Sequence, residues 1–138
     1  GVDLPDKTKT MFPTIAIPKL HKEYHTWINE LNFCKEEITI FENQLAASVG
    51  RITDNFALAQ VEHFQNQFIR EKEVIDELKH KLHISEKQLA GFVKDLSGLG
   101  LESIRMDNHS KLREDMHIFR KIYTGLKVDF RRFESEHI

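Results

Sequence analysis

Apolar residues recur along most of this chain in steps of three and four, the spacing that returns to one face of an α-helix. The pattern fills three stretches, 18–49, 54–96 and 108–137, and Glu71 and Ser85 are its only interruptions. Two apolar positions in every seven residues are typical of helices that pack side by side as in a coiled coil. The predicted seams are Leu20, Tyr24, Trp27, Leu31, Cys34, Ile38, Phe41 and Leu45; Ala57, Val61, Phe64, Phe68, Ile75, Leu78, Leu82, Leu89, Phe92 and Leu96; and His109, Leu112, Met116, Phe119, Tyr123, Leu126, Phe130, Phe133 and His137.

The residues between the seams are typical of helix ends. Pro18 suits a first helical turn, and Gly50 suits a stop. Thr53 with Asp54 would begin the second helix, residues 97–100 (Ser-Gly-Leu-Gly) would end it, and Asp107 or Asn108 would cap the third. Such short connections predict an all-α, elongated, antiparallel three-helix bundle, coiled-coil-like, either complete in itself or completed by dimerisation.

A chain of 138 residues is the length of one domain. We therefore expect a single helical-bundle domain over residues 18–138. Residues 1–17 are polar at their start and contain two of the three prolines, Pro5 and Pro13, which predicts a flexible or extended tail.

The charge balance narrows the classes of partner. The chain has 20 Lys and Arg against 22 Asp and Glu, a net charge of -2, so it lacks the basic surface of a nucleic-acid-binding protein. It has no apolar run of the roughly 18 residues that a membrane span needs. Cys34 is the single cysteine, which excludes an intrachain disulfide and a CxxC motif. These features favour a cytoplasmic protein with neither nucleic acid nor membrane as its partner.

Eight histidines raise a metal-binding hypothesis, because imidazole is the commonest protein ligand for transition metals. Two Glu-x-x-His elements, ending at His80 and His117, match the element found in di-iron bundles, and the expected chain reversals put His25 level with Glu77. The seams, however, predict that both elements point outward. The competing interpretation is solvated surface histidines, with His109 as a neutral imidazole that closes the core. The candidate ligands for zinc or iron are His21, His25, His80, His83, His109 and His117.

No pattern typical of an enzyme is present. Glu71, the one carboxylate on a seam, is expected at the bundle edge or paired with a base on a neighbouring helix. Cys34 is expected to be a small buried apolar residue, because nothing in its neighbourhood is placed to activate a thiol. Glycine loops that bind phosphate and nucleophile elbows are absent, so no catalytic residue and no cofactor is predicted.

Apolar residues outside the seams favour an interaction protein. They could widen the intramolecular core, receive the segment 11–17 or form a dimer interface, and exposed apolar surface of this kind is typical of a binding surface. Our main hypothesis is a non-enzymatic bundle that associates with itself, as a homodimer, or with a partner protein; metal binding is the alternative. The off-seam residues include Phe33, Ile40, Ile69, Ile84, Ile118 and Val128, of which Phe33, Ile40, Ile69 and Ile118 are the predicted interface.

In this pattern the chain resembles the small, uncharacterised helical-bundle proteins of bacteria over residues 18–137. The resemblance implies an all-helical bundle. It implies no activity, cofactor or site residue.

Overall fold

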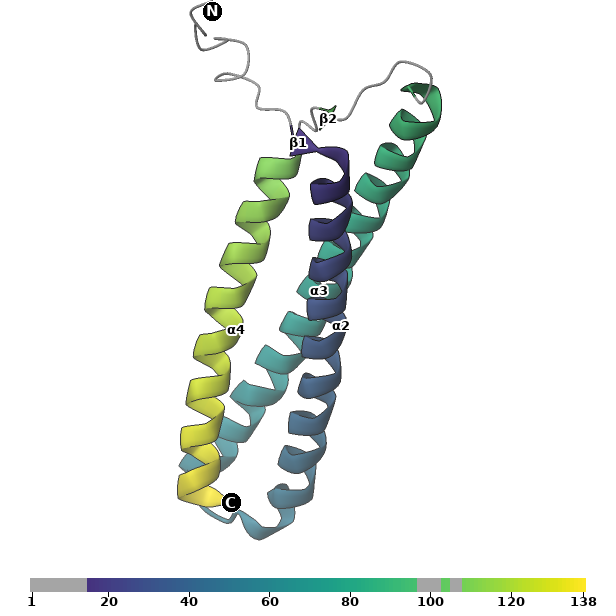
Figure 1. Cartoon of the computed structure of the whole chain (residues 1–138). Coiled ribbons are helices and arrows are strands. Elements are labelled where there is room, and N and C mark those ends of the chain that lie inside the picture. Colours follow the sequence, from purple (N-terminus) through teal and green to yellow (C-terminus); the bar gives the residue numbers. More distant parts are fainter. Residues whose placement is uncertain (1–14, 97–102, 105–107) are drawn as a thin grey trace, which may run out of the picture.

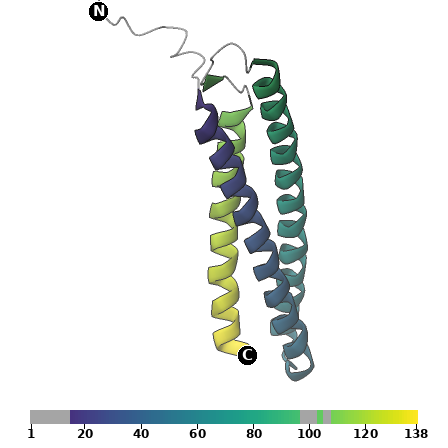
Figure 2. The same cartoon turned by 45° about the vertical axis from the view of Figure 1, so that its right-hand side comes forward.

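The protein is a bundle of three long helices (Figure 1). The computed structural model describes residues 15–96, 103–104 and 108–138. Helices α2 and α4 run parallel to each other, and α3 runs antiparallel between them in the chain (Figures 1 and 2). The predicted all-α three-helix bundle is therefore confirmed. The elements are β1 (Ile15–Ala16), α2 (Ile17–Ser48), the 3-10 turn η1 (Val49–Arg51), α3 (Asn55–Leu96), β2 (Ser103–Ile104) and α4 (His109–His137).

The helices begin and end within one residue of the stretches 18–49, 54–96 and 108–137. Pro18 lies in the first turn of α2, as its missing N–H favours. At the start of α3, Oδ2 of Asp54 accepts a hydrogen bond of 3.0 Å from the Ala57 N–H, so Asp54 is the N-cap. Asn108 occupies the N-cap position of α4, but its side chain makes no capping bond and instead donates to Oγ of Ser85 at 2.8 Å. Asp107, the other expected cap, lies outside the described residues.

The chain just before α2 is paired rather than free. Ile15 lies opposite Ile104 and Ala16 opposite Ser103 in a two-stranded antiparallel pair, which links the start of α2 to the connection that precedes α4. Of the tail expected over residues 1–17, residues 1–14 lie outside the described part of the chain, as does the expected helix stop at 97–100.

The core follows the predicted seams over most of their length. On α2 and α4 every apolar seam residue is buried, and on α3 the seam is buried from Ala57 to Leu89. Phe92 is an exception with 43% of its surface exposed. The contact of Asn108 with Ser85 marks where α4 begins, and Phe92 lies two turns farther along α3. No turn of α4 faces Phe92 there, so the seam continues past the helix that would cover it.

The half of the core nearer to η1 is packed with phenylalanine. Phe68 on α3 contacts Phe130 on α4 edge to face with ring centroids 5.1 Å apart, and Phe41 on α2 lies 5.3 Å from the same ring. Phe64 joins them at 5.4 Å from Phe130. Edge-to-face and tilted pairs at these distances are the favoured arrangement of aromatic rings, and here they connect all three helices.

Glu71 is buried within the apolar seam of α3, with only 4% of its surface exposed. The expected ion pair with a neighbouring helix is not found among the described residues. Burial raises the pKa of the Glu71 carboxyl above its usual value, and Arg70 on the same helix offsets part of this shift. Folding thus disfavours the charged form of the Glu71 carboxyl, so a carboxylate at this position costs stability at neutral pH.

We predict that Glu71→Gln stabilises the protein at pH 7 by about 1 kcal/mol, because it removes a poorly solvated charge. A raised pKa means that the cost is present at high pH and disappears as the pH falls through the folded-state value. The gain should therefore shrink at pH 4. Urea unfolding at both pH values measures it, with Glu73→Gln as an exposed control on the same helix. An equal gain at pH 4 and pH 7 would contradict the explanation.

Candidate functional site

A ladder of ion pairs connects the parallel helices α2 and α4. Three acidic residues on α2 and three basic residues on α4 recur at intervals of seven and meet in the same order. The pairs are Glu23 with Arg113 at 3.1 Å, Glu30 with Arg120 at 2.8 Å and Glu37 with Lys127 at 3.2 Å.

This ladder sets the register between helices that no short loop connects. In a parallel pair of helices, charges that flank the apolar seam at heptad spacing are all aligned in only one register. Each partly exposed pair contributes little stability by itself, but a shift of one helix by less than seven residues would break all three together. This feature was not among the predictions from the sequence, although glutamates at 23, 30 and 37 and bases at 113, 120 and 127 show it directly.

The lowest step of the ladder includes Tyr123. Its hydroxyl donates a hydrogen bond of 2.6 Å to Oε1 of Glu37, while Nζ of Lys127 lies 4.9 Å from the centre of its ring. Burial and the Glu37 carboxylate raise the pKa of Tyr123, so the phenol keeps its proton. Burial, with Glu30 and Glu37 nearby, also raises the pKa of Cys34 to about 11. The buried thiol is not activated as a nucleophile.

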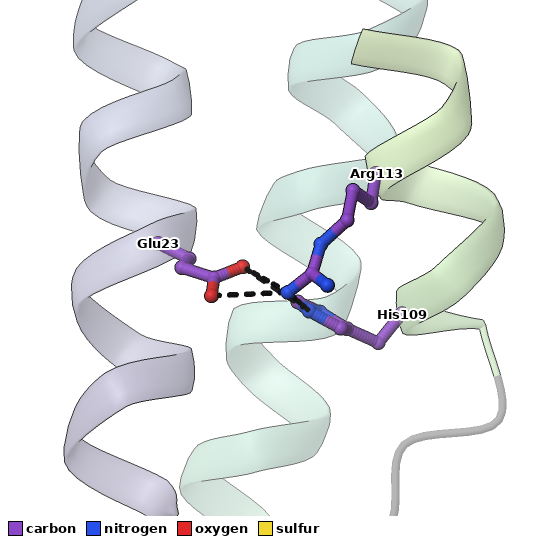
Figure 3. A network of polar contacts seen from close by, with 3 residues as sticks. All are labelled: Glu23, His109 and Arg113. Atoms are coloured by element: carbon purple, nitrogen blue, oxygen red, sulfur yellow. Dashed lines mark hydrogen bonds and ion pairs between the residues drawn. The ribbon is translucent and has the colours of Figure 1, made fainter. Parts of the chain in front are cut away.

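At the upper end of the ladder, Glu23 also contacts a buried histidine (Figure 3). His109 has 2% of its surface exposed; its Nε2 lies 3.2 Å from Oε2 of Glu23 and 3.1 Å from a guanidinium nitrogen of Arg113. The imidazole ring stacks on Trp27 with centroids 5.6 Å apart and lies 5.7 Å from the ring of Tyr24. His109 therefore closes the core where α4 begins, as the sequence predicted.

The neutral form of His109 is favoured in the folded protein. Burial lowers the pKa of His109 below its usual 6.5; the Glu23 carboxylate opposes this shift and Arg113 adds to it. The second ring nitrogen, Nδ1, is buried and has no hydrogen-bond partner among the described residues. Protonation would therefore place a positive charge beside the Arg113 cation and leave a buried Nδ1–H without an acceptor.

We predict that the protein loses stability as the pH falls from 6.5 to 5. The pKa of His109 is depressed on folding, so its contribution to stability is complete above pH 6.5 and is lost as the pH falls through the folded-state pKa. His109→Phe should flatten the dependence of the unfolding free energy on pH between 5 and 7. His80→Gln, at an exposed position on α3, is the control and should leave it unchanged. An unaltered slope in His109→Phe would refute the assignment to His109.

The other predicted metal ligands are dispersed over the surface. The rings of His21 and His25 are stacked on α2 with centroids 6.4 Å apart, and both line a groove with Glu86 of α3. The expected match of His25 with Glu77 is thus wrong. Lys35 pairs with Asp76 at 2.7 Å and shows the cause: η1 and the residues after it shift the reversal toward the start of α3.

The remaining candidates lie on α3 and α4. His80, His83 and His117 are exposed, and Nδ1 of His83 lies 3.5 Å from a carboxylate oxygen of Glu86. Glu77 and Glu114 are exposed as well, as the heptad pattern predicted. Across residues 15–96, 103–104 and 108–138, no three His, Cys, Asp or Glu side chains are gathered so that they could hold a metal ion.

An open groove of about 780 Å³ lies between α3 and α4, and none of its lining residues comes from α2. Its floor is apolar, and charged or amide side chains surround it. We call this feature the α3–α4 groove. It is lined by Ile118, Ile122, Gly125 and Leu126, with His63, Gln67, Glu114, His117, Lys121 and Asp129 around them.

The four predicted interface residues are all exposed but do not share one surface. Phe33 and Ile40 lie seven residues apart on the outer face of α2, and Ile69 lies on α3. Ile118 lines the α3–α4 groove, and the other three do not. Their role in association stays a prediction.

Comparison with known proteins finds no matching family model, no matching curated protein and no matching solved structure. The chain is therefore assigned to no functionally characterised family, in agreement with a resemblance of pattern alone. None of the described helices is both long enough and apolar enough to cross a membrane.

Proposed function

We propose that this protein is a non-enzymatic bundle that works by association, receiving a helix of another protein chain in the α3–α4 groove. The observation that carries the proposal is the second apolar face of α4. Its first face, the seam, is buried against α2 and α3, yet Ile118 and Ile122, which line the groove, are about half exposed. A helix whose partners are all in the same chain needs only one such face.

The positions of the ionisable groups support association rather than catalysis. The residues with shifted pKa values, among them Glu71, His109 and Tyr123, lie within the core and do not line the groove. A reactive site would place such groups where a substrate can reach them. The groove instead has the amphipathic character of surfaces that bind a helix.

The charges favour a protein partner over a nucleic acid. The most basic part of the chain is on α4, but Arg120 and Lys127 are held by glutamates of α2. Too few free cations remain there to follow a phosphate backbone. A cytoplasmic location is part of the proposal and is supported by the buried, unpaired Cys34, which a reducing compartment would preserve.

The proposal predicts that a photoreactive phenylalanine analogue at position 122 forms a covalent adduct with another polypeptide in cells that express the protein natively. The same analogue at Lys87, on the outer face of α3, is the control and should form none. Placing it at Phe33 tests the outer face of α2 in the same way. The mass of an adduct tells whether the partner is the same chain or a different one. Absence of an adduct from position 122 would refute the proposed function.

Metal binding is the second candidate, and the His21–His25 pair is the observation that favours it. Two imidazoles one turn apart on a helix can chelate zinc when water or another chain supplies the remaining ligands. If this is the function, protein purified without a histidine tag carries stoichiometric metal, and a chelator lowers its melting temperature. The double variant His21→Ala, His25→Ala should then lose the metal. Metal-free protein with an unchanged melting temperature would exclude this candidate.

A further inference from the structure

A second groove, of about 880 Å³, lies between the first turns of α2 and the last turns of α3. None of the described residues that line it comes from α4, which begins level with Ser85 and so does not extend along the end of α3. We call this feature the α2–α3 groove. Its apolar lining consists of Ile17 and Pro18 of α2 with Leu89, Ala90 and Val93 of α3.

The apolar lining of the α2–α3 groove is left uncovered by the residues that the structure describes. Val93 has 40% of its surface exposed and Ala90 is exposed as well, although Leu89 next to them belongs to the core. Apolar side chains gathered in a groove are typical of a contact site, whereas single exposed ones are ordinary. A further segment of polypeptide is therefore expected to cover this groove.

The chain enters the bundle beside this groove. Ile17 and Pro18 line it, and they follow directly on β1 (Figure 1). Residues 1–14, which lie outside the described part of the chain, are therefore attached to the bundle at the edge of the groove. Phe12 is three residues before Ile15, so the two Cα atoms are at most roughly 10 Å apart. So short a tether gives an effective concentration on the order of millimolar, which favours this segment over a separate partner.

The sequence of the attached segment suits an apolar groove. Met11 and Phe12 follow six residues, 5–10, that include no large apolar side chain. Methionine fills irregular apolar gaps, and a phenylalanine ring buries a large apolar area. Met11 and Phe12 are thus the part of the segment nearest to the groove that gains most from leaving water.

We propose that Met11 and Phe12 pack into the α2–α3 groove of their own chain, against Ala90 and Val93. The segment completes the apolar core at the end of the bundle that α4 does not reach. It acts as an intramolecular partner that keeps this surface of α2 and α3 from other chains. The α2–α3 groove is separate from the α3–α4 groove, so this proposal and the proposed function can fail independently.

Disulfide trapping tests where the segment lies. The double variant Met11→Cys, Val93→Cys, which keeps Phe12, should form a disulfide within one chain under mild oxidation. Met11→Cys with Gly91→Cys is the matched control and should form none, because position 91 is exposed, has room for a side chain and points to the opposite side of α3. The native Cys34 does not interfere, because it is buried and its pKa is raised to about 11. Equal trapping in the two variants, or trapping in neither, would overturn the proposal.

The mass of the trapped species separates the segment's own chain from a second copy. A disulfide within one chain leaves the mass of a monomer and does not depend on protein concentration. A disulfide that joins two chains and declines on dilution would show that the segment of another copy fills the groove, and it would overturn the intramolecular arrangement.

Thermal unfolding tests the same contact without added cysteines. Phe12→Ser should lower the melting temperature by about 4 °C, because it removes the larger apolar side chain from the groove. Val2→Ser is the control, since it removes an apolar side chain ten residues farther from the groove and should leave the melting temperature unchanged. The fluorescent dye anilinonaphthalene sulfonate should bind more to Phe12→Ser than to Val2→Ser, because the apolar lining is opened. A Phe12→Ser variant with the original melting temperature and dye binding would overturn the proposal.

Discussion

The match between two heptad series of charges determines how α4 is rotated about its own axis. Glutamates on α2 and bases on α4 meet at three successive heptads, with Glu23 and Arg113 at the upper end and Glu37 and Lys127 at the lower. Because the bases of α4 must face α2 while its seam faces the core, the opposite flank of the helix is left toward α3 and solvent. Ile118 and Ile122 lie on that flank. The groove is thus a consequence of the same constraint that sets the register.

Polar side chains are also buried inside the bundle, and several of them form a layer where α4 begins. The start of α4 is marked by His109 between Glu23 and Trp27 and by Asn108 on Ser85, whereas the far end is packed with phenylalanine. Buried polar groups seldom add stability over apolar ones, but they penalise every misaligned arrangement in which they lack partners. Phenylalanine supplies burial and tolerates small shifts. In this core, the polar layer where α4 begins favours one alignment of the helices. The aromatic cluster at the other end supplies much of the buried apolar surface.

Much of the fold could be predicted from the sequence because heptad spacing reports directly which face of a helix is buried. The apolar residues of the α2 and α4 seams were correct on this basis, whereas His137, predicted at the end of the α4 seam, is exposed. The predictions were wrong where the outcome depends on where a helix begins or on how many residues a turn takes up. Phe92 is exposed because α4 starts too late to cover it, and His25 lies beside Glu86 because the turn after α2 consumes several residues. The ion-pair ladder was visible in the sequence, but only a search for charges at the same spacing as the seam would have found it.

The candidate site was less predictable, since exposure of an apolar residue does not tell which exposed residues act together. Single apolar side chains on a surface are ordinary, and Phe33 and Ile40 on the outer face of α2 line no described groove. Ile118 and Ile122 differ because α3 supplies a second wall of the groove and Gly125 adds no side chain to its floor. The residues that fold α4 occupy its seam and the flank toward α2, and the residues of the groove occupy the other flank. Folding and association therefore depend on separate positions of one helix, so a change on the groove side can alter assembly and leave the bundle intact.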